Sequence, residues 1–354
     1  MNYEISLLTT MAIAVMFALS LNLITGFCGQ ISLGHAAFQG VGAYTAAMLG
    51  QAGWPFLATL PLAMILAGLL GVIVGLASLR VRADFLAITT MGVGFLFVGI
   101  VRQQDVLGGE LGISSIPDHG LGRVGFMALA LVVCAAVAAL SVYIKRSWMG
   151  RVFNGIAEDE DTMRVLGIDV PRYKLAAFAM GTALAGLSGA FYAYHLNFIG
   201  AESFGFVESI TVLSMVVFGG IGSVPGVIIA AALLSVLPAW FQVIGDYKLL
   251  VYGGLLFLMM RFSPGGMAGL VTRFFSPVGS VTLSDSAGSR WIAVSPRRAV
   301  STGRSARLRR GLPRSTIGLA GWRSVRPRDY AVRAARGRWR TDSPAPYRTV
   351  AEHS

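Results

Sequence analysis

The stretch "GFCGQISLGHAAFQGVGAYTAA", residues 26–47, is rich in Gly and Ala, and His35 is its only side chain that can carry a charge. Strongly apolar sequence flanks it on both sides. A soluble strand–turn–helix unit uses such glycines to hold a phosphate, but that interpretation requires a polar surface nearby, which this sequence lacks. The role of these small, uncharged residues therefore has to be inferred from the composition of the whole chain.

The composition around this stretch is that of an integral membrane protein. Hydrophobic residues make up 55% of the 354 residues and charged residues 13%, whereas soluble domains contain about 25% charged residues. A helix needs about 20 apolar residues to cross the hydrocarbon core. By this measure the sequence predicts spans near 5–25, 33–51, 55–78, 85–102, 124–144, 173–198, 209–222, 226–244 and 248–262. We expect an all-α integral membrane protein, a polytopic bundle of about eight or nine transmembrane helices.

One of these spans is interrupted. Pro225, with glycines on either side, follows the short apolar segment 209–222. This pattern favours a broken or re-entrant element, because non-helical backbone at membrane depth is tolerated where other parts of the protein surround it. The sequence therefore predicts either eight or nine spans.

Loop charges predict the orientation, since Lys and Arg accumulate in short cytoplasmic loops. Arg80 and Arg82 lie between the third and fourth spans. The loop 145–174 contains six further basic residues, namely Lys145, Arg146, Arg151, Arg164, Arg172 and Lys174. Both loops are assigned to the cytoplasm. The loops near 103–123 and 199–208 collect acidic residues instead and are assigned to the outside.

Four polar side chains in and beside the opening stretch are expected to point into the bundle, because unpaired polar groups are costly in lipid. They are Gln30, Ser32, His35 and Gln39. Two interpretations stay open: these residues line a substrate pathway, or they hydrogen-bond between helices. No cluster of charged side chains lies near the middle of a span, which disfavours proton- or ion-coupled transport.

Small residues recur every four positions in several spans, a spacing that lets helix backbones approach closely. The ladders include Gly181, Ala185, Gly189 and Ala193, and also Gly42, Ala46 and Gly50. The alternative is that Gly and Ala are simply frequent in membrane helices. We predict that the ladder starting at Gly181 is a helix-packing contact.

No catalytic constellation is recognisable in the sequence. The two cysteines, Cys28 and Cys134, lie in apolar segments without metal-ligand spacing. No nucleophile–base pair can be assembled from the scattered His and Ser residues. The lysines never follow a glycine as they do in a nucleotide-binding loop. We therefore expect no enzyme, no catalytic residue, no metal and no cofactor, so that energy for transport would come from a partner.

The cytoplasmic loop 145–174 contains the pattern of a short helix. Acidic residues occupy 158–161, Arg164 follows in the last turn, and Gly167 stands where a helix commonly ends. These features predict a helix from about 156 to 166. A helix of about three turns is not stable alone in water and needs a surface to lie on.

The apolar residues Ile156, Met163 and Leu166 are predicted to share one side of that helix. Its acidic start disfavours a surface of anionic lipid, so the segment is either a docking helix for a protein partner or a passive loop element. The candidate contact residues for such a partner are Ala157, Glu158, Asp159, Met163, Leu166 and Gly167.

Several segments together resemble a known family. They are "GFCGQISLGHAAFQGVGAYTAAML", "LRVRADFLAITTMGVG", "LGGELGISSIP", "GRVFNGIAEDEDTMRVLGIDVPRYKLAAFAMGTALAGLSGAFYAY" and "VVFGGIGSVPGVIIAA". In this order they resemble successive segments of the branched-chain amino-acid ABC transporter permease family, in its M-type subunit, over about residues 5–272. The resemblance implies a multi-pass inner-membrane permease that pairs with a second, H-type permease subunit. It also implies two cytoplasmic ATP-binding subunits and a periplasmic substrate-binding protein as partners.

The resemblance implies that Glu158, Asp159 and Gly167 match the loop by which such permeases engage their ATPases. It implies branched-chain amino acids, or related small amino acids and amides, as the cargo. The sequence departs from the family at 92–95, where relatives commonly carry an acidic residue. The alternative function is a stand-alone secondary transporter or facilitator for small polar solutes, which the missing intramembrane charges and the acidic cytoplasmic segment disfavour.

The last 79 residues differ from the permease domain, 1–275. Residues 276–354 contain 16 arginines, no lysine and four acidic residues, so the whole net charge of +12 lies in this tail. Such a composition cannot bury enough apolar surface to offset chain entropy, which predicts a disordered cytoplasmic tail. We favour a neutral extension or a shifted reading frame over a functional tail. A functional tail would be drawn to membrane lipid, and we expect no nucleic-acid partner.

Overall fold

The computed structural model describes residues 2–78, 83–114, 116–118, 120–240 and 254. The tail 276–354, the proposed domain boundary at 275 and the basic pair Arg80 and Arg82 lie outside these residues. The span expected near 248–262 also lies outside them, apart from Gly254.

The opening stretch follows a helix whose last turns are unusual. Helix α1 (Asn2–Leu21) continues directly as a π-helical segment, η1 (Asn22–Phe27). The chain leaves the helical conformation after Cys28, and residues 28–34 connect η1 to α2, which extends over His35–Gln51. Gly29 in this connection has a φ of 71°, a left-handed conformation that glycine adopts without the steric penalty of a Cβ atom.

The other long helices are α3 (Phe56–Ser78), α4 (Ala83–Gln103), α5 (Gly122–Arg146), α8 (Val170–Leu196), α9 (Phe206–Gly219) and α10 (Val224–Trp240). Within the described residues, six helical stretches are long and apolar enough to cross a membrane. They are Tyr3–Phe27, Phe56–Ala77, Leu86–Gln103, Gly122–Arg146, Val170–Leu196 and Ala201–Gly219. Helix α2, with 17 residues, is shorter. The structure therefore confirms a mostly helical protein with several apolar spans, and the expected count of eight or nine stays a prediction.

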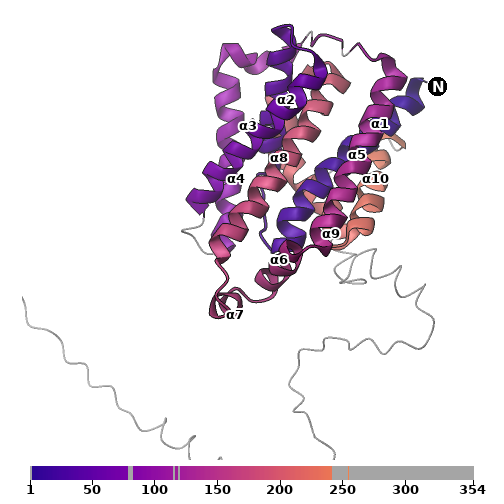
Figure 1. The fold of residues 1–354 in the computed structure, drawn as a ribbon. Coiled ribbons are helices and arrows are strands. Elements are labelled where there is room, and N and C mark those ends of the chain that lie inside the picture. The colour runs from indigo at the N-terminus through magenta and orange to yellow at the C-terminus, as the bar shows by residue number, and fades with distance from the viewer. Residues whose placement is uncertain (1, 79–82, 115, 119, 241–253, 255–354) are drawn as a thin grey trace, which may run out of the picture. The chain divides into compact units, whose positions relative to one another are not determined.

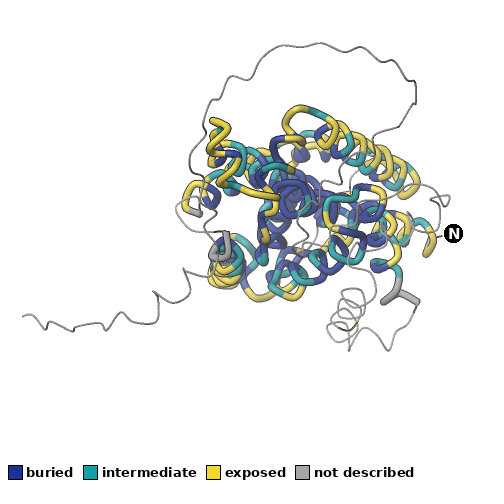
Figure 2. The backbone as a smooth tube through the Cα atoms, turned by 90° about the horizontal axis from the view of Figure 1, so that it is seen from below, coloured by how far each residue is buried: buried dark blue, intermediate teal, exposed yellow. Residues whose placement is uncertain are grey.

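Helix α8 lies at the centre of the bundle and packs against α1, α2 and α3 (Figure 1). Figure 2 shows buried residues gathered in the middle of the bundle and exposed residues on its rim. The rim contains large apolar side chains, including Ile65 and Ile73 of α3, which are 63% and 58% exposed. An apolar rim of this kind suits contact with lipid tails, which are themselves apolar.

Glycines of α2 and α8 bring the two helices into backbone contact. A Cβ atom at Gly189 would overlap the main-chain carbonyl of Gln39, and a Cβ atom at Gly42 would overlap the backbone of Gly186. Gly181 lies against the Ile24 side chain of η1 in the same way. The other two residues of this ladder, Ala185 and Ala193, are buried.

One end of the bundle carries a short β-ribbon, which brings two predicted outside loops together. Strand β1 (Ile113–Ser114) pairs antiparallel with β2 (Phe198–Ile199). The short 3₁₀ segments η2 (Asp105–Leu107), η3 (Gly109–Leu111) and η4 (Ala201–Phe204) lie beside these strands in the sequence. An ion pair between Arg102 and Glu202 also joins the two loops. We call this the β-ribbon end.

The opposite end carries two short helices, α6 (Trp148–Glu158) and α7 (Glu160–Val165) (Figure 1). The interruption predicted near Pro225 lies between Gly219, where α9 ends, and Val224, where α10 begins. Gly220 and Gly222 in this connection have φ angles of 100° and 79°. We call this end of the bundle, which carries α6, α7 and the interruption, the α6–α7 end.

Candidate functional site

The predicted single helix over 156–166 is wrong, because the chain breaks at Asp159. This residue is extended, with φ −157° and ψ 105°, so that it ends α6 and caps α7. Its carboxylate accepts hydrogen bonds from the amides of Asp161 at 3.0 Å and Thr162 at 3.3 Å, and from the Thr162 hydroxyl. Aspartate is favoured at such a cap and disfavoured inside a helix, which explains the break.

These hydrogen bonds hold the pKa of Asp159 below its ordinary value. The largest cause is the hydrogen bond from the Thr162 side chain, followed by those from the backbone amides of Thr162 and Asp161. Donors to a carboxylate favour its ionised form. Asp159 is therefore a charged cap that orders the start of α7.

Gly167 ends α7 as the sequence predicts. It has a φ of 81°, its amide donates to the Arg164 carbonyl at 3.0 Å, and the Ile168 amide donates to the Met163 carbonyl at 3.1 Å. A side chain at this position would strain the backbone, since left-handed angles favour glycine. The turn sends the chain from α7 toward the start of α8.

Ion pairs neutralise part of the acidic charge of the loop. Glu160 pairs with Lys174 of α8 and, at 3.4 Å, with Arg164. Asp161 pairs with Arg164 at 3.0 Å. The Lys174 side chain is 15% exposed, so its contact fastens α7 to the central helix. Of the candidate contact residues, Glu158 forms no ion pair with another described residue and is exposed.

The predicted apolar stripe divides in two. Ile156 and Met163 are buried at 2% and 9% exposure, and they hold α6 and α7 on the protein itself. Leu166 is 68% exposed, so it does not share the buried side of Ile156 and Met163 as the single predicted helix required. Its neighbour Val165, which the sequence analysis did not select, is 88% exposed. Two adjacent apolar side chains at the end of α7 thus form the exposed pair Val165–Leu166.

Contacts join α6 to the helix break at 28–34. Ala157 of α6 lies against Gly29, where a Cβ atom would stand 3.1 Å from the Ala157 Cα and Cβ atoms. Phe153 of α6 meets Tyr173 of α8 edge to face, with ring centroids 6.3 Å apart. Gly29 can approach so closely because it has no side chain.

A second set of contacts joins the end of α5, just before α6, to the break between α9 and α10. Lys145 Nζ donates to the Gly222 carbonyl at 2.7 Å, and the Gly222 amide donates to Asn22 Oδ1 at 3.0 Å. Asn22 is fully buried in η1. Both helix breaks therefore meet at the α6–α7 end.

Three of the four polar candidates lie around the break 28–34 and are buried. The Gln30 amide donates to the Ile24 carbonyl at 3.2 Å, and its side chain contacts Cys28 Sγ at 3.6 Å. Ser32 Oγ has no hydrogen-bond partner among the described residues. Gln30 thus closes the turn after η1, an architectural contact.

His35 begins α2 and is fully buried. Its Nε2 lies 2.8 Å from Ser20 Oγ, and its ring stacks on Phe17 with centroids 5.4 Å apart. Its Nδ1 has no partner among the described residues. His35 thus makes a hydrogen bond between helices, the second of the two interpretations of the polar residues.

Gln39 is separated from the other three by a turn of α2. It is 4% exposed and lines a cavity of about 170 Å³ between α1, α8, α9 and α10, which we call the inner cavity. The other three polar candidates, Gln30, Ser32 and His35, do not line this cavity. Glu208 of α9 and Tyr192 of α8 also line the inner cavity, and no motif or spacing in the sequence singles them out.

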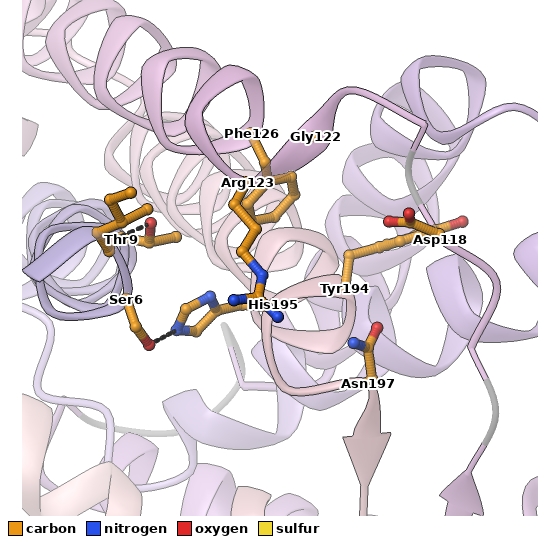
Figure 3. Close-up of a pocket in the computed structure, with 10 residues that line it drawn as sticks. Ser6, Thr9, Asp118, Gly122, Arg123, Phe126, Tyr194, His195 and Asn197 are labelled. Carbon is orange, nitrogen blue, oxygen red and sulfur yellow. Dashed lines mark hydrogen bonds between the residues drawn. The ribbon is translucent and has the colours of Figure 1, made fainter. Parts of the chain in front are cut away.

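A larger cavity of about 490 Å³ opens at the β-ribbon end between α1, α5 and α8, and we call it the outer pocket. In Figure 3, Ser6 of α1 and Arg123 of α5 point toward His195 of α8. His195 Nε2 lies 3.4 Å from Ser6 Oγ and 3.1 Å from Thr10 Oγ1. Within the described residues, no three His, Cys, Asp or Glu side chains are grouped so as to hold a metal ion.

Comparisons with known proteins agree with this architecture. Residues 4–260 match the family described as "Branched-chain amino acid transport system / permease component". The chain is 33% identical to the high-affinity branched-chain amino acid transport system permease protein LivM of Escherichia coli, covering 74% of this chain and 69% of that one. It is 29% identical to the corresponding permease protein BraD of Pseudomonas aeruginosa, covering 74% and 93%.

A shorter similarity extends to a second kind of permease protein. The chain is 32% identical to LivH of Salmonella typhimurium over 141 residues, which is 39% of this chain and 46% of that one. No solved structure matches the chain at a significant level. The matched family consists of membrane permeases and not of enzymes. The described residues include six apolar helices long enough to cross a membrane, and the family match covers most of these residues. This multi-pass inner-membrane protein therefore belongs to the permease family of branched-chain amino-acid ABC transporters.

Proposed function

We propose that the chain forms part of the inner-membrane translocation pathway of an ABC importer for branched-chain amino acids or related small amino acids and amides. Partner ATPases bind the α6–α7 end and drive the conformational cycle. The observation that carries this proposal is the exposed pair Val165–Leu166 on a short, locally braced helix. Exposed apolar side chains beside polar ones favour a protein partner.

The bracing of α7 supports its role as a contact element. The cap at Asp159, the turn at Gly167 and the ion pair between Glu160 and Lys174 hold its backbone before any partner binds. A preorganised surface loses less conformational entropy on binding. The exposed candidates Ala157, Glu158, Asp159, Leu166 and Gly167 border this surface, whereas Met163 supports it from within.

A movement of α6–α7 would reach the bundle through its contacts with the helix breaks. Ala157 touches Gly29, and Lys145, at the end of α5, binds Gly222 between α9 and α10. Breaks in helices allow two segments to change angle at a small cost, because few backbone hydrogen bonds cross them. We propose that these two breaks are where the ATPase motion changes the bundle.

The family and the loop charges support the rest of the assembly. The similarity to both LivM and LivH proteins supports pairing with an H-type permease subunit. The basic loop 145–174 supports a cytoplasmic position for the α6–α7 end, which leaves the β-ribbon end to a periplasmic substrate-binding protein. We propose eight or nine spans in all, a permease domain of 1–275, and a cytoplasmic tail that takes no part in transport.

The test compares exposed apolar residues at the two ends. Val165→Asp and Leu166→Asp place a charge on the proposed ATPase contact, and Leu111→Asp places one at the β-ribbon end, where Leu111 is 88% exposed, as is Val165. We expect both α7 variants to insert normally, to lose capture of the ATP-binding subunits during purification and to lose leucine uptake by at least about tenfold, as for a central interface residue. The Leu111→Asp variant should keep ATPase capture.

Two outcomes would contradict the proposal. Normal ATPase capture and uptake by the Leu166→Asp and Val165→Asp variants would remove α7 from the interface. Leucine equilibration by the purified chain alone, without ATP, would support the alternative of a stand-alone facilitator.

A further inference from the structure

The inner cavity is lined by both polar and apolar side chains. The polar ones include Gln39 of α2, Tyr192 of α8 and Glu208 in the first turn of α9. The apolar ones include Phe17 of α1 and Met215 of α9. The cavity volume of about 170 Å³ is the space of roughly five or six water molecules. The cavity therefore suits a single small solute that has both a charged and an aliphatic part.

The polar groups of this cavity are held in place by the packing of the bundle. The main-chain carbonyl of Gln39 lies against Gly189, where a Cβ atom would overlap it, so α2 is fixed against α8 at this level. Tyr192, Ser203 and Glu208 all line this cavity. A preformed set of polar groups binds a solute with less loss of side-chain entropy.

We propose that the inner cavity binds the amino acid in transit, with the Glu208 carboxylate pairing with its α-ammonium group and the apolar lining residues contacting its aliphatic side chain. The inference rests on the proposed transport function and specifies its substrate class. The Gln39 amide is placed to donate to the substrate carboxylate. Charge-assisted hydrogen bonds of this kind are stronger than neutral ones, so a solute without an ammonium group binds less well.

The inner cavity and the outer pocket follow one another along α1. Ser6 and Thr9 line the outer pocket, and Thr10 lines the inner cavity. Thr10 Oγ1 lies 3.1 Å from Nε2 of His195. His195 itself lines the outer pocket (Figure 3). The contact between Thr10 and His195 joins a lining residue of the inner cavity to a lining residue of the outer pocket, so its loss is expected to ease the entry of a solute from the β-ribbon end.

Thiol labelling in right-side-out membrane vesicles tests this inference. Cys28 and Cys134 are replaced by serine, and single cysteines are introduced on α9 by Thr211→Cys or Ser214→Cys. Thr211 lines the inner cavity and Ser214 does not, although they are almost equally buried, at 2% and 3% exposure. A small, membrane-impermeant methanethiosulfonate reagent should label the Thr211→Cys protein faster. Thr10→Val, which removes the hydroxyl and keeps the shape, should raise that rate roughly fivefold, as expected for one lost hydrogen bond.

Protection experiments identify the ligand. Leucine should slow the labelling of the Thr211→Cys protein, whereas 4-methyl-2-oxopentanoate, which lacks the ammonium group, should not. Glu208→Gln should raise the leucine concentration for half-protection roughly tenfold while labelling persists. Glu202→Gln, at a residue that pairs with Arg102 outside the cavity, is the matched control.

Equal labelling of the two single-cysteine proteins, equal protection by the oxo acid, or unchanged protection in the Glu208→Gln protein would each overturn the inference. None of these measurements needs ATP. If leucine uptake by the complete transporter is normal and protection is absent, the inner cavity is wrong and the proposed function stands. If protection is seen and the ATPases have no effect on uptake, the proposed function fails instead.

Discussion

The hydrogen bonds that order the start of α7 join residues close in sequence, whereas backbone amides in and just after the break 28–34 donate to side chains of distant helices. Asp159 caps its own next turn through Thr162. In and just after the break, by contrast, the Leu33 amide donates to Thr90 Oγ1 of α4 at 3.0 Å, and the Ala36 amide donates to Ser209 Oγ of α9 at 3.1 Å.

The difference shows what each segment can do. A segment that satisfies its own hydrogen bonds can present side chains to a partner without unfolding the rest, so changes in α7 should affect binding more than stability. A segment satisfied by other helices shares their stability, because its buried amides lose their partners when those helices shift. Changes around 28–39 should therefore affect the whole bundle.

The largest effect is expected from Gly189→Leu, which attacks the packing behind α2. The leucine would overlap the Gln39 carbonyl, and backbone cannot move aside as a side chain can. Overpacking costs about 1–3 kcal/mol even where neighbours adjust, so we expect at least that loss of unfolding free energy, or no assembly. Thermal melts in detergent measure it. Gly99→Leu on α4, where a Cβ atom meets nothing within 4 Å, is the control, and a wild-type melt for Gly189→Leu would contradict the packing contact.

A smaller effect is expected from Ser20→Ala, which removes the partner of His35 Nε2. A buried nitrogen left without a partner costs about 1–3 kcal/mol. Ser188→Ala is the matched control, because both serines are fully buried and both donate to a main-chain carbonyl of their own helix. The difference between the two melting shifts isolates the hydrogen bond to His35. Equal shifts would show that this bond adds no stability.

The smallest global effect is expected at Asp159, although the local effect is clear. Because the pKa of Asp159 is lowered, its ionised carboxylate stabilises α7 fully above the ordinary aspartate pKa. This stabilisation is lost as the pH falls through the lowered pKa. Hydrogen exchange of the α7 amides, corrected for intrinsic rates, should rise at acidic pH while the melting temperature barely changes. Asp159→Asn keeps a capping oxygen without the charge and should remove the pH dependence. An unchanged pH dependence in that variant would assign it to another group.

The sequence predicted the long apolar helices well because length and hydropathy are properties of a continuous segment. The expected span 55–78 corresponds to α3, Phe56–Ser78, and 124–144 to α5, Gly122–Arg146. The end of α7 at Gly167 was also predicted, since a glycine closing a turn acts locally. The break at Asp159 was missed because a run of acidic residues suits either the first turn of a helix or a cap.

The functional surfaces were predicted less completely. The spacing placed Leu166 on one side of a single helix with Ile156 and Met163, but the chain breaks at Asp159 and Leu166 is exposed while the other two are buried. Gln39 was selected as a polar residue among apolar ones, and the sequence carries no sign that Glu208 and Tyr192 would join it in one cavity.

The sequence by itself determined the class of protein, the positions of its apolar helices and the small residues that let them approach, because each depends on composition or spacing within one segment. Only the tertiary structure decided which polar residues meet, which face of α7 is exposed, and where the inner cavity lies between α1, α8, α9 and α10. These outcomes depend on the angles and contacts between helices far apart in the chain. Side-chain periodicity within one helix does not specify them.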